Sequence, residues 1–266
     1  MPSRDWPIIV GGCHRSGTSL LRRILDAHSR IFCGPEVKFF QDFYSGYVQD
    51  PIRHGRFFTT ARMALPEAEL LELFGSAFVK LHERAAARAG KVRWADKCPE
   101  NVVYLDDWAR LLGDRWLFVH VVRNPLDTLA SIKEIRFPFA IPSGLGARID
   151  FYKRYFEAGL AFGAAAPDRY HRIVYEELVR EPRTTLEGLH EWLGEVFELE
   201  QLSFNARPHQ NGLEDPKVGR TERIHDESVG RWRQVLDDDE AAEIVERCAV
   251  LWRQIDADGR WWAPPP

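Results

Sequence analysis

Short apolar segments alternate along the chain with longer segments in which apolar residues recur every three or four positions. The first pair is typical: Ile8-Ile9-Val10 predicts a buried strand, and the residues after it place Leu20, Leu21, Ile24 and Leu25 on one helix face. Further strands are expected up to Cys33, over Lys91–Trp94, over 116–122 and over Arg172–Tyr175. Strands that alternate with helices predict an α/β fold with a central parallel sheet flanked by helices.

The expected helices lie between these strands and after the last one. Asn124 predicts an N-cap, with Pro125 at the first helical position and Asp127 closing a capping box. The aromatic-rich residues 37–62 predict irregular structure, and the polar segment 205–232 is too long for a passive connection. The other helices are expected after Pro66 (with Leu70, Phe74, Ala77 and Leu81 at helical spacing, ended by Gly90), over roughly 100–112, over roughly 148–164, from Pro182 to Gly194 (with Leu186, Leu189 and Leu193), and after Asp237–Asp239 (with Ile244, Cys248, Leu251 and Ile255).

A glycine-rich loop joins the first strand to the first helix. Its spacing, Gly12, four residues, Gly17 and the hydroxyl pair Thr18-Ser19, is that of a phosphate-binding P-loop. Backbone N–H groups converge at the start of such a helix, and the helix dipole favours an anion there. Thr18 stands where a nucleotide triphosphatase carries lysine. The loop therefore predicts a phosphate ligand other than a triphosphate on magnesium.

A second phosphate contact is expected at the end of another strand. Val119–Val122 predicts a buried strand that ends in Arg123, and Ser131 follows eight residues later in a new helix. An arginine at a strand end and a serine eight residues later can together bind one more phosphate. In a parallel sheet both segments lie at the carboxyl ends of strands, where ligands bind.

Composition narrows the class of protein. The chain has 266 residues, enough for one large α/β domain over 1–266, and its formal net charge of −4 argues against a nucleic-acid binder. We find no apolar stretch near the roughly 20 residues of a membrane span and no signal-peptide pattern. The four cysteines form no C-x-x-C pair, which disfavours zinc and fits a reducing cytoplasm.

These segments together resemble the sulfotransferases that use 3'-phosphoadenylyl sulfate (PAPS), most nearly their tyrosylprotein and bacterial branch. The resemblance covers nearly the whole chain and rests on landmarks in the family's order, no one of which is specific alone. They are Gly-Gly-x-x-Arg-Ser-Gly-Thr at 11–18, Cys-Gly-Pro-Glu at 33–36, Asp-Lys-x-Pro-x-Asn at 96–101, Val-Arg-Asn-Pro-x-Asp at 122–127, Val-Tyr-Glu-Glu-Leu at 174–178 and Lys-Val-Gly-Arg-Thr at 217–221.

The resemblance implies transfer of a sulfuryl group from PAPS to a hydroxyl or amine by in-line displacement. Glu36 matches the family's catalytic base, and Lys97 matches the lysine that neutralises charge on the bridging oxygen. Arg15 is expected to polarise the sulfuryl oxygens, and Thr221 to assist the leaving group, so that no metal is required. The donor-binding residues that it implies are Arg15, Ser16, Gly17, Thr18 and Ser19 for the 5'-phosphosulfate, Arg123 and Ser131 for the 3'-phosphate, and Tyr175, Lys217, Gly219 and Arg220.

Departures from the family pattern leave other interpretations open. His14 stands where proline is common and is an alternative base, and Val37-Lys38 replaces the Thr-Arg of the tyrosylprotein enzymes. The acceptor is then a small molecule, a glycan or a lipid, and aromatics at 39–47 and in Phe137–Ile141 either line its pocket or pack in the core. A homodimer stays open. The competing functions are a kinase-like phosphotransferase using ATP, disfavoured by the missing P-loop lysine, and a silent binding module, disfavoured by Glu36 together with Lys97.

Overall fold

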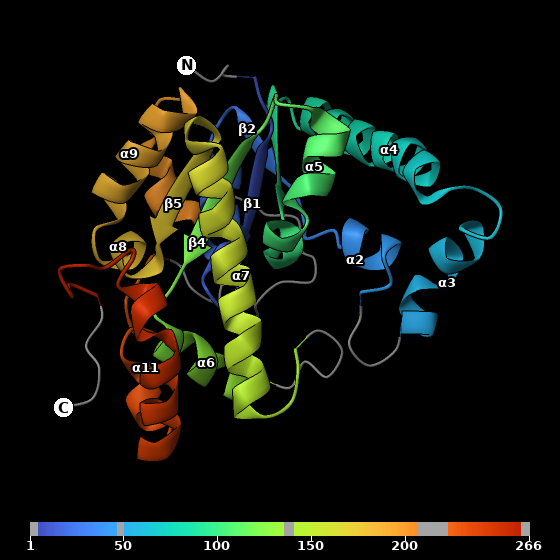
Figure 1. Ribbon diagram of the computed structural model, residues 1–266. Coiled ribbons are helices and arrows are strands. Elements are labelled where there is room, and N and C mark those ends of the chain that lie inside the picture. Colours follow the sequence, from blue (N-terminus) through green and yellow to red (C-terminus); the bar gives the residue numbers. More distant parts are fainter. Residues whose placement is uncertain (1–4, 47–50, 136–140, 207–222, 262–266) are drawn as a thin grey trace.

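Five parallel strands form the centre of the protein (Figure 1). The computed structural model describes residues 5–46, 51–135, 141–206 and 223–261. The strands are β1 (Ile8–Gly12), β2 (Ile31–Cys33), β3 (Arg93–Lys97), β4 (Leu117–Val122) and β5 (Tyr170–Val174), in the order β2-β3-β1-β4-β5. The predicted α/β fold with a parallel sheet is confirmed. Since β3 and β4 flank β1, the crevice favoured by ligands opens beyond the end of β1.

Helices cover both faces of this sheet, which explains why β1, β2, β3 and β4 are buried along their whole length. Ile8 and Val10 face a cluster with α1 (Thr18–Ala27) and α9 (Pro182–Leu193), whereas Ile9 between them faces the opposite cluster. That second cluster packs α4 (Glu67–Arg88), α5 (Leu105–Leu112), α6 (Pro125–Glu134), α7 (Leu145–Ala165) and α11 (Asp238–Trp252). Shorter elements are α2 (Phe39–Phe43), α3 (Pro51–Ala61), α8 (Tyr175–Arg180), and the 3₁₀ turns η1 (Pro99–Val103), η2 (Pro167–Arg169), η3 (Leu199–Ala206) and η4 (Arg231–Gln234).

Most predicted helices are present, but the expected structure of two segments was wrong. The segment 37–62 contains α2 and α3 instead of only irregular structure. The helix expected over 100–112 is divided into η1 and α5, with Tyr104 between them. The end of α9 is as predicted, with Gly194 capping it in the left-handed conformation. Helix α11 begins at Asp238, within the acidic run after which it was expected, and Asp237 caps it with a capping box to Glu240.

The buried face of α4 differs from the predicted one. Leu70 is buried, but Ala77 and Leu81 face solvent, and the helix instead buries Gly75, Phe78 and His82. Gly75 lies so close to α5 that a Cβ there would stand 2.3 Å from Leu111 Cδ2. The His82 ring can be buried because its Nε2 lies 3.1 Å from Asp96 Oδ2, within hydrogen-bond distance.

Asp127 does not close the expected capping box. Asn124 caps α6 by accepting from the Leu126 amide, as predicted, but its own N–H donates to Glu176 Oε1. The Asp127 carboxylate accepts instead from the backbone amides of Gly230, at 2.7 Å, and Trp232, at 2.9 Å. This acid therefore ties α6 to η4, about a hundred residues further along the chain.

Helix α7 lies against the sheet through a glycine. Gly159 faces His120 on β4, where a Cβ would come within 2.3 Å of the imidazole ring. Burial lowers the pKa of His120 to about 3, so that the ring packs as a neutral group, and its Nδ1 lies 3.0 Å from the Tyr170 hydroxyl. In the described part of the chain, no helix is both long and apolar enough to cross a membrane.

Candidate active site

The P-loop has the backbone geometry of an anion cradle. Gly17 caps the start of α1 at φ +100°, and Arg15 has φ +70°, which is uncommon for a residue with a side chain. Both the amide and the hydroxyl of Ser16 donate to the Cys13 carbonyl, which fixes the turn. A Cβ on Gly17 would lie 2.4 Å from Tyr175 Cδ2, so that the loop is closed on that side by the first residue of α8.

Arg15 connects the two predicted phosphate-binding segments. Its Nε donates to Ser131 Oγ at 3.1 Å, and its carbonyl accepts from Arg123 Nη1 at 2.9 Å. Arg123 also donates to the Ser228 carbonyl and stacks 4.4 Å from the centre of the Tyr175 ring. The structure thus gathers these predicted donor-binding residues, although Arg123 and Ser131 meet through Arg15 and not directly.

Lys97 and Glu36 form an ion pair beside the P-loop. Lys97 ends β3 and is buried; its Nζ lies 2.5 Å from Glu36 Oε2 and donates to Ser19 Oγ at 3.3 Å. The second oxygen of Glu36 lies 3.1 Å from Lys38 Nζ. The predicted base and the predicted catalytic cation therefore touch, and the carboxylate lies between two ammonium groups.

A buried carboxylate, Glu100, organises the far side of this pair. It accepts from Lys38 at 2.7 Å and from the Cys98 thiol at 2.9 Å, and His14 Nε2 lies 3.1 Å away. Burial opposes its ionisation, but the charges of His14 and Lys38 outweigh burial and hold the pKa of Glu100 well below its usual range. Burial opposes the charge of Lys38 as well, yet Glu100 and Glu36 raise its pKa.

Two acids and a thiol, Glu36, Glu100 and Cys98, come within 4.8 Å of one another, a grouping that can hold a metal ion. Lys38 bridges the two carboxylates, and Lys97 covers the other oxygen of Glu36. Burial raises the pKa of the Cys98 thiol well above its usual value, and the thiol donates to Glu100. The cations of the chain itself thus balance these acids.

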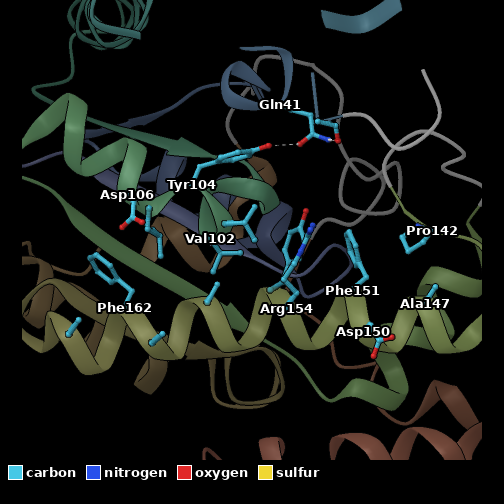
Figure 2. Close-up of a pocket in the computed structure, with 17 residues that line it drawn as sticks. Gln41, Val102, Tyr104, Asp106, Pro142, Ala147, Asp150, Phe151, Arg154 and Phe162 are labelled. Carbon is cyan, nitrogen blue, oxygen red and sulfur yellow. Dashed lines mark hydrogen bonds between the residues drawn. The ribbon is translucent and has the colours of Figure 1, made fainter. Parts of the chain in front are cut away.

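A groove of about 1030 Å³ opens beside this charged cluster (Figure 2). Helix α7 forms one wall with Phe151, Arg154 and Tyr155, and η1 and the start of α5 form the other with Val102 and Tyr104. The His14 ring packs 5.7 Å from Phe151 and 5.9 Å from Tyr155, between centroids, and so lies between the groove and Glu100. The groove is a candidate acceptor pocket.

The described aromatic residues of the segment 39–47 do not line this groove. Phe39, Phe40 and Phe43 pack in the core, with Phe39 stacked on Phe78 at 4.5 Å between ring centroids. Other predicted residues fall outside the described ranges: Thr221, Lys217, Gly219 and Arg220 of the late loop, and Tyr47, Phe137, Pro138, Phe139 and Ala140 of the aromatic segments.

Sequence reasoning missed the two residues that complete the charged cluster. Glu100 lies inside the landmark at 96–101, in a position that the pattern leaves variable, and Lys38 follows the predicted base by two residues. Glu100 lies three residues after Lys97, and Lys38 lies two residues after Glu36. This closeness to two residues already assigned to catalysis could have indicated their role. The residues of the α7 wall gave no such signal, because helical aromatics usually belong to the core.

Comparison with known proteins defines the class. Residues 7–198 match the Sulfotransferase family, and the chain belongs to that family of enzymes. A putative protein-tyrosine sulfotransferase of Caenorhabditis briggsae is 24% identical over 77% of this chain and 77% of its own length.

Solved structures show the same fold. The sulfotransferase domain of the Synechococcus PCC 7002 olefin synthase has a TM-score of 0.65 at 20% identity and covers 93% of this chain and 95% of its own. Mouse sulfotransferase SULT7A1, solved in complex with PAP, has a TM-score of 0.52 at 13% identity and covers 97% of this chain and 87% of its own.

Proposed function

We propose that this enzyme transfers a sulfuryl group from PAPS to a hydroxyl or amine of a small acceptor, with Glu36 as the base. The Lys97–Glu36 pair beside the P-loop carries this proposal, because it places a proton acceptor and a cation at one point. Family membership supports PAPS as the donor, and so does mouse SULT7A1, a structural neighbour complexed with PAP.

The described residues fit such a donor. A P-loop with threonine in place of lysine suits a phosphosulfate without magnesium, and Gly17 supplies the left-handed backbone conformation at the start of α1. Arg123 is almost fully buried, and its Nε has no hydrogen-bond partner in the part of the chain that the structure describes. A buried guanidinium N–H without a partner costs free energy, which an anionic ligand can recover.

In the proposed mechanism Lys97 exchanges partners. The donor supplies the sulfuryl group, and Lys97 turns from Glu36 to the bridging oxygen that takes the electron pair as its bond to sulfur breaks. Glu36 Oε2 is thereby released from its hydrogen bond and accepts the proton of the attacking hydroxyl or amine. Lys38 keeps Oε1, which holds the carboxylate in place during the transfer. Arg15 polarises the sulfuryl oxygens.

Similarity to the C. briggsae relative does not by itself assign a protein-tyrosine acceptor to this chain. Lys38 stands where the tyrosylprotein enzymes have arginine, and it is held by Glu36 and Glu100 instead of being available to a peptide. The cysteines at 13, 33, 98 and 248 are unpaired thiols, which supports the expectation of a cytoplasmic enzyme.

The direct test is the affinity for nucleotides. The 3'-phosphorylated product PAP should bind at least about tenfold more tightly than ADP, because one charge-assisted contact from Arg123 is worth roughly 1.5–3 kcal/mol. Calorimetry on the wild type and on Arg123→Met measures this difference, which the substitution should remove. Equal affinities in the wild type, or magnesium-dependent turnover of ATP, would favour the kinase-like alternative.

A further inference from the structure

We infer that the groove beside α7 accepts a small aromatic or apolar hydroxyl compound that carries a carboxylate, and that Arg154 binds this carboxylate. The inference rests on the proposed sulfuryl transfer and names the chemical class of its acceptor. Three observations carry it: the position of the groove beside the cluster that contains Glu36, the position of Arg154, and the placement of acids along the groove.

The groove borders the charged cluster that contains the proposed base. Its aromatic residues Phe151 and Tyr155 pack against His14. The His14 ring lies 3.1 Å from Glu100, and Glu100 is joined to Glu36 by Lys38. A compound lying along the aromatic wall is therefore next to the catalytic cluster, with the His14 ring between the compound and Glu100.

Arg154 supplies a positive charge in the middle of the apolar wall. Its guanidinium lies 5.8 Å from the centre of the Phe151 ring and 5.3 Å from that of Tyr155, and Figure 2 shows it rising from α7 into the groove. Within the described ranges it pairs with no carboxylate. Packing on ring faces leaves the edge N–H groups of a guanidinium available for a bidentate carboxylate.

The electrostatics of the opposite wall agree with this position. Burial raises the pKa of the Tyr104 hydroxyl to about 12, with the nearby charge of Glu100 acting in the same direction and that of Arg154 acting against it. Arg154 thus acts across the groove on a residue of the other wall. A carboxylate bound between them would meet a cation and the hydroxyl of Tyr104, which donates a long hydrogen bond to Gln41 Oε1 at 3.5 Å.

The acids along the groove differ in whether their charge is balanced. Asp106 lies toward one end and Asp150 toward the other, with Arg154 between them (Figure 2). Asp150 is already paired with Arg247 of α11 at 2.5 Å. Asp106 therefore disfavours a carboxylate at its own end of the groove, and Arg154 attracts one to the centre.

A matched pair of acceptors tests the inference. 3-(4-Hydroxyphenyl)propionate and its primary amide share the ring, the hydroxyl and the length, and they differ in charge. With PAPS as donor and mass-spectrometric detection of the sulfated product, the wild type should show a kcat/KM about tenfold to a hundredfold higher for the acid, mainly through KM. Arg154→Met should abolish the preference, and Arg154→Lys should keep part of it.

Lys153→Met is the control variant. Lys153 is the next cation on α7, but its charge acts on Cys248 of α11 and it does not line the groove. The acid preference should be unchanged in this variant. Equal use of acid and amide by the wild type, or a preference that survives Arg154→Met, would overturn the inference while leaving sulfuryl transfer in place.

A binding measurement separates this inference from the proposed function. Calorimetric titration of the PAP-loaded protein with the acid needs no turnover, and Arg154→Met should weaken that binding by the same factor. If no acceptor gave a sulfated product while binding of the acid still depended on Arg154, the result would contradict only the assignment as a transferase. Binding of the acid that does not depend on Arg154 would refute the role of this residue.

Discussion

Replacing Glu36 by glutamine removes the negative charge that pairs with two lysines, Lys97 and Lys38. The amide keeps the shape of the carboxylate but cannot take the acceptor's proton, and loss of a general base costs about a hundredfold to ten-thousandfold in turnover. Lys97 is fully buried and would lose its carboxylate partner, keeping the Ser19 hydroxyl. Breaking a buried ion pair from one side costs about 3–5 kcal/mol, and we expect the lower end because of that hydroxyl.

The same substitution should strengthen the binding of PAP. In the wild type the Glu36 carboxylate competes with the anionic nucleotide for Lys97, and unit charges about 6 Å apart at an effective dielectric constant of about 20 interact by about 3 kcal/mol. PAP affinity should therefore rise by up to about a hundredfold in Glu36→Gln. Low turnover together with tighter product binding distinguishes the loss of the base from a general disruption of the site.

Three measurements check this prediction: single-turnover rate, calorimetric PAP affinity, and unfolding by urea with and without PAP. Glu83→Gln, an exposed acid of α4, is the control and should match the wild type in all three. Wild-type turnover in Glu36→Gln would refute the assignment. If His14→Ala abolished turnover instead, the base would be His14.

Three further predictions concern neighbouring groups. Lys97→Ala should slow single-turnover sulfuryl transfer at saturating donor more than it weakens PAP binding; recovery of the wild-type rate at saturation would make this lysine a docking residue. Gly17→Ala should weaken PAP binding and lower stability by about 1–3 kcal/mol because its Cβ would meet the Tyr175 ring, whereas Gly188→Ala, in open space, should slightly stabilise. Burial raises the pKa of Glu176 to about 7, so the protonated form stabilises the fold at low pH, and this contribution of about 3 kcal/mol disappears as the pH rises from about 4.5 to 7. Thermal unfolding of Glu176→Gln should lack that decline in stability. Parallel pH profiles of the wild type and the variant would contradict this prediction.

The sequence predicted the sheet and the phosphate segments because those features depend on local pattern. Apolar runs such as 117–122 are buried on both faces, and the glycine spacing at 12–17 determines the turn. The prediction of the buried face of α4 failed because two of its buried residues, Gly75 and His82, are not recognised as core residues from the sequence. Their burial depends on Leu111 of α5 and on Asp96 of β3, which no periodicity in α4 reveals.

The site could be predicted as a set of residues and not as a set of contacts. Arg15, Arg123, Ser131 and Tyr175 were expected near a phosphate and do lie together. Which of them bond to one another depends on the left-handed conformation of Arg15, a three-dimensional detail. The role of Lys38 as a bridge between two carboxylates likewise requires strand β3 and the segment after β2 to be placed side by side.

The contact between Gly159 and His120 has a consequence for the choice of acceptor. Gly159 lies on the sheet side of α7, while Arg154 and Tyr155 on the same helix form a wall of the groove. A methyl group at 159 cannot fit beside the imidazole unless the ring or the helix shifts, and a shift of α7 would change the wall that it contributes to the groove. The dimensions of the groove are therefore determined from behind, by a residue that no acceptor touches. Exchanges at the helix–sheet contact, such as a smaller residue at 120 paired with alanine at 159, offer a way to change acceptor size while every groove residue stays the same.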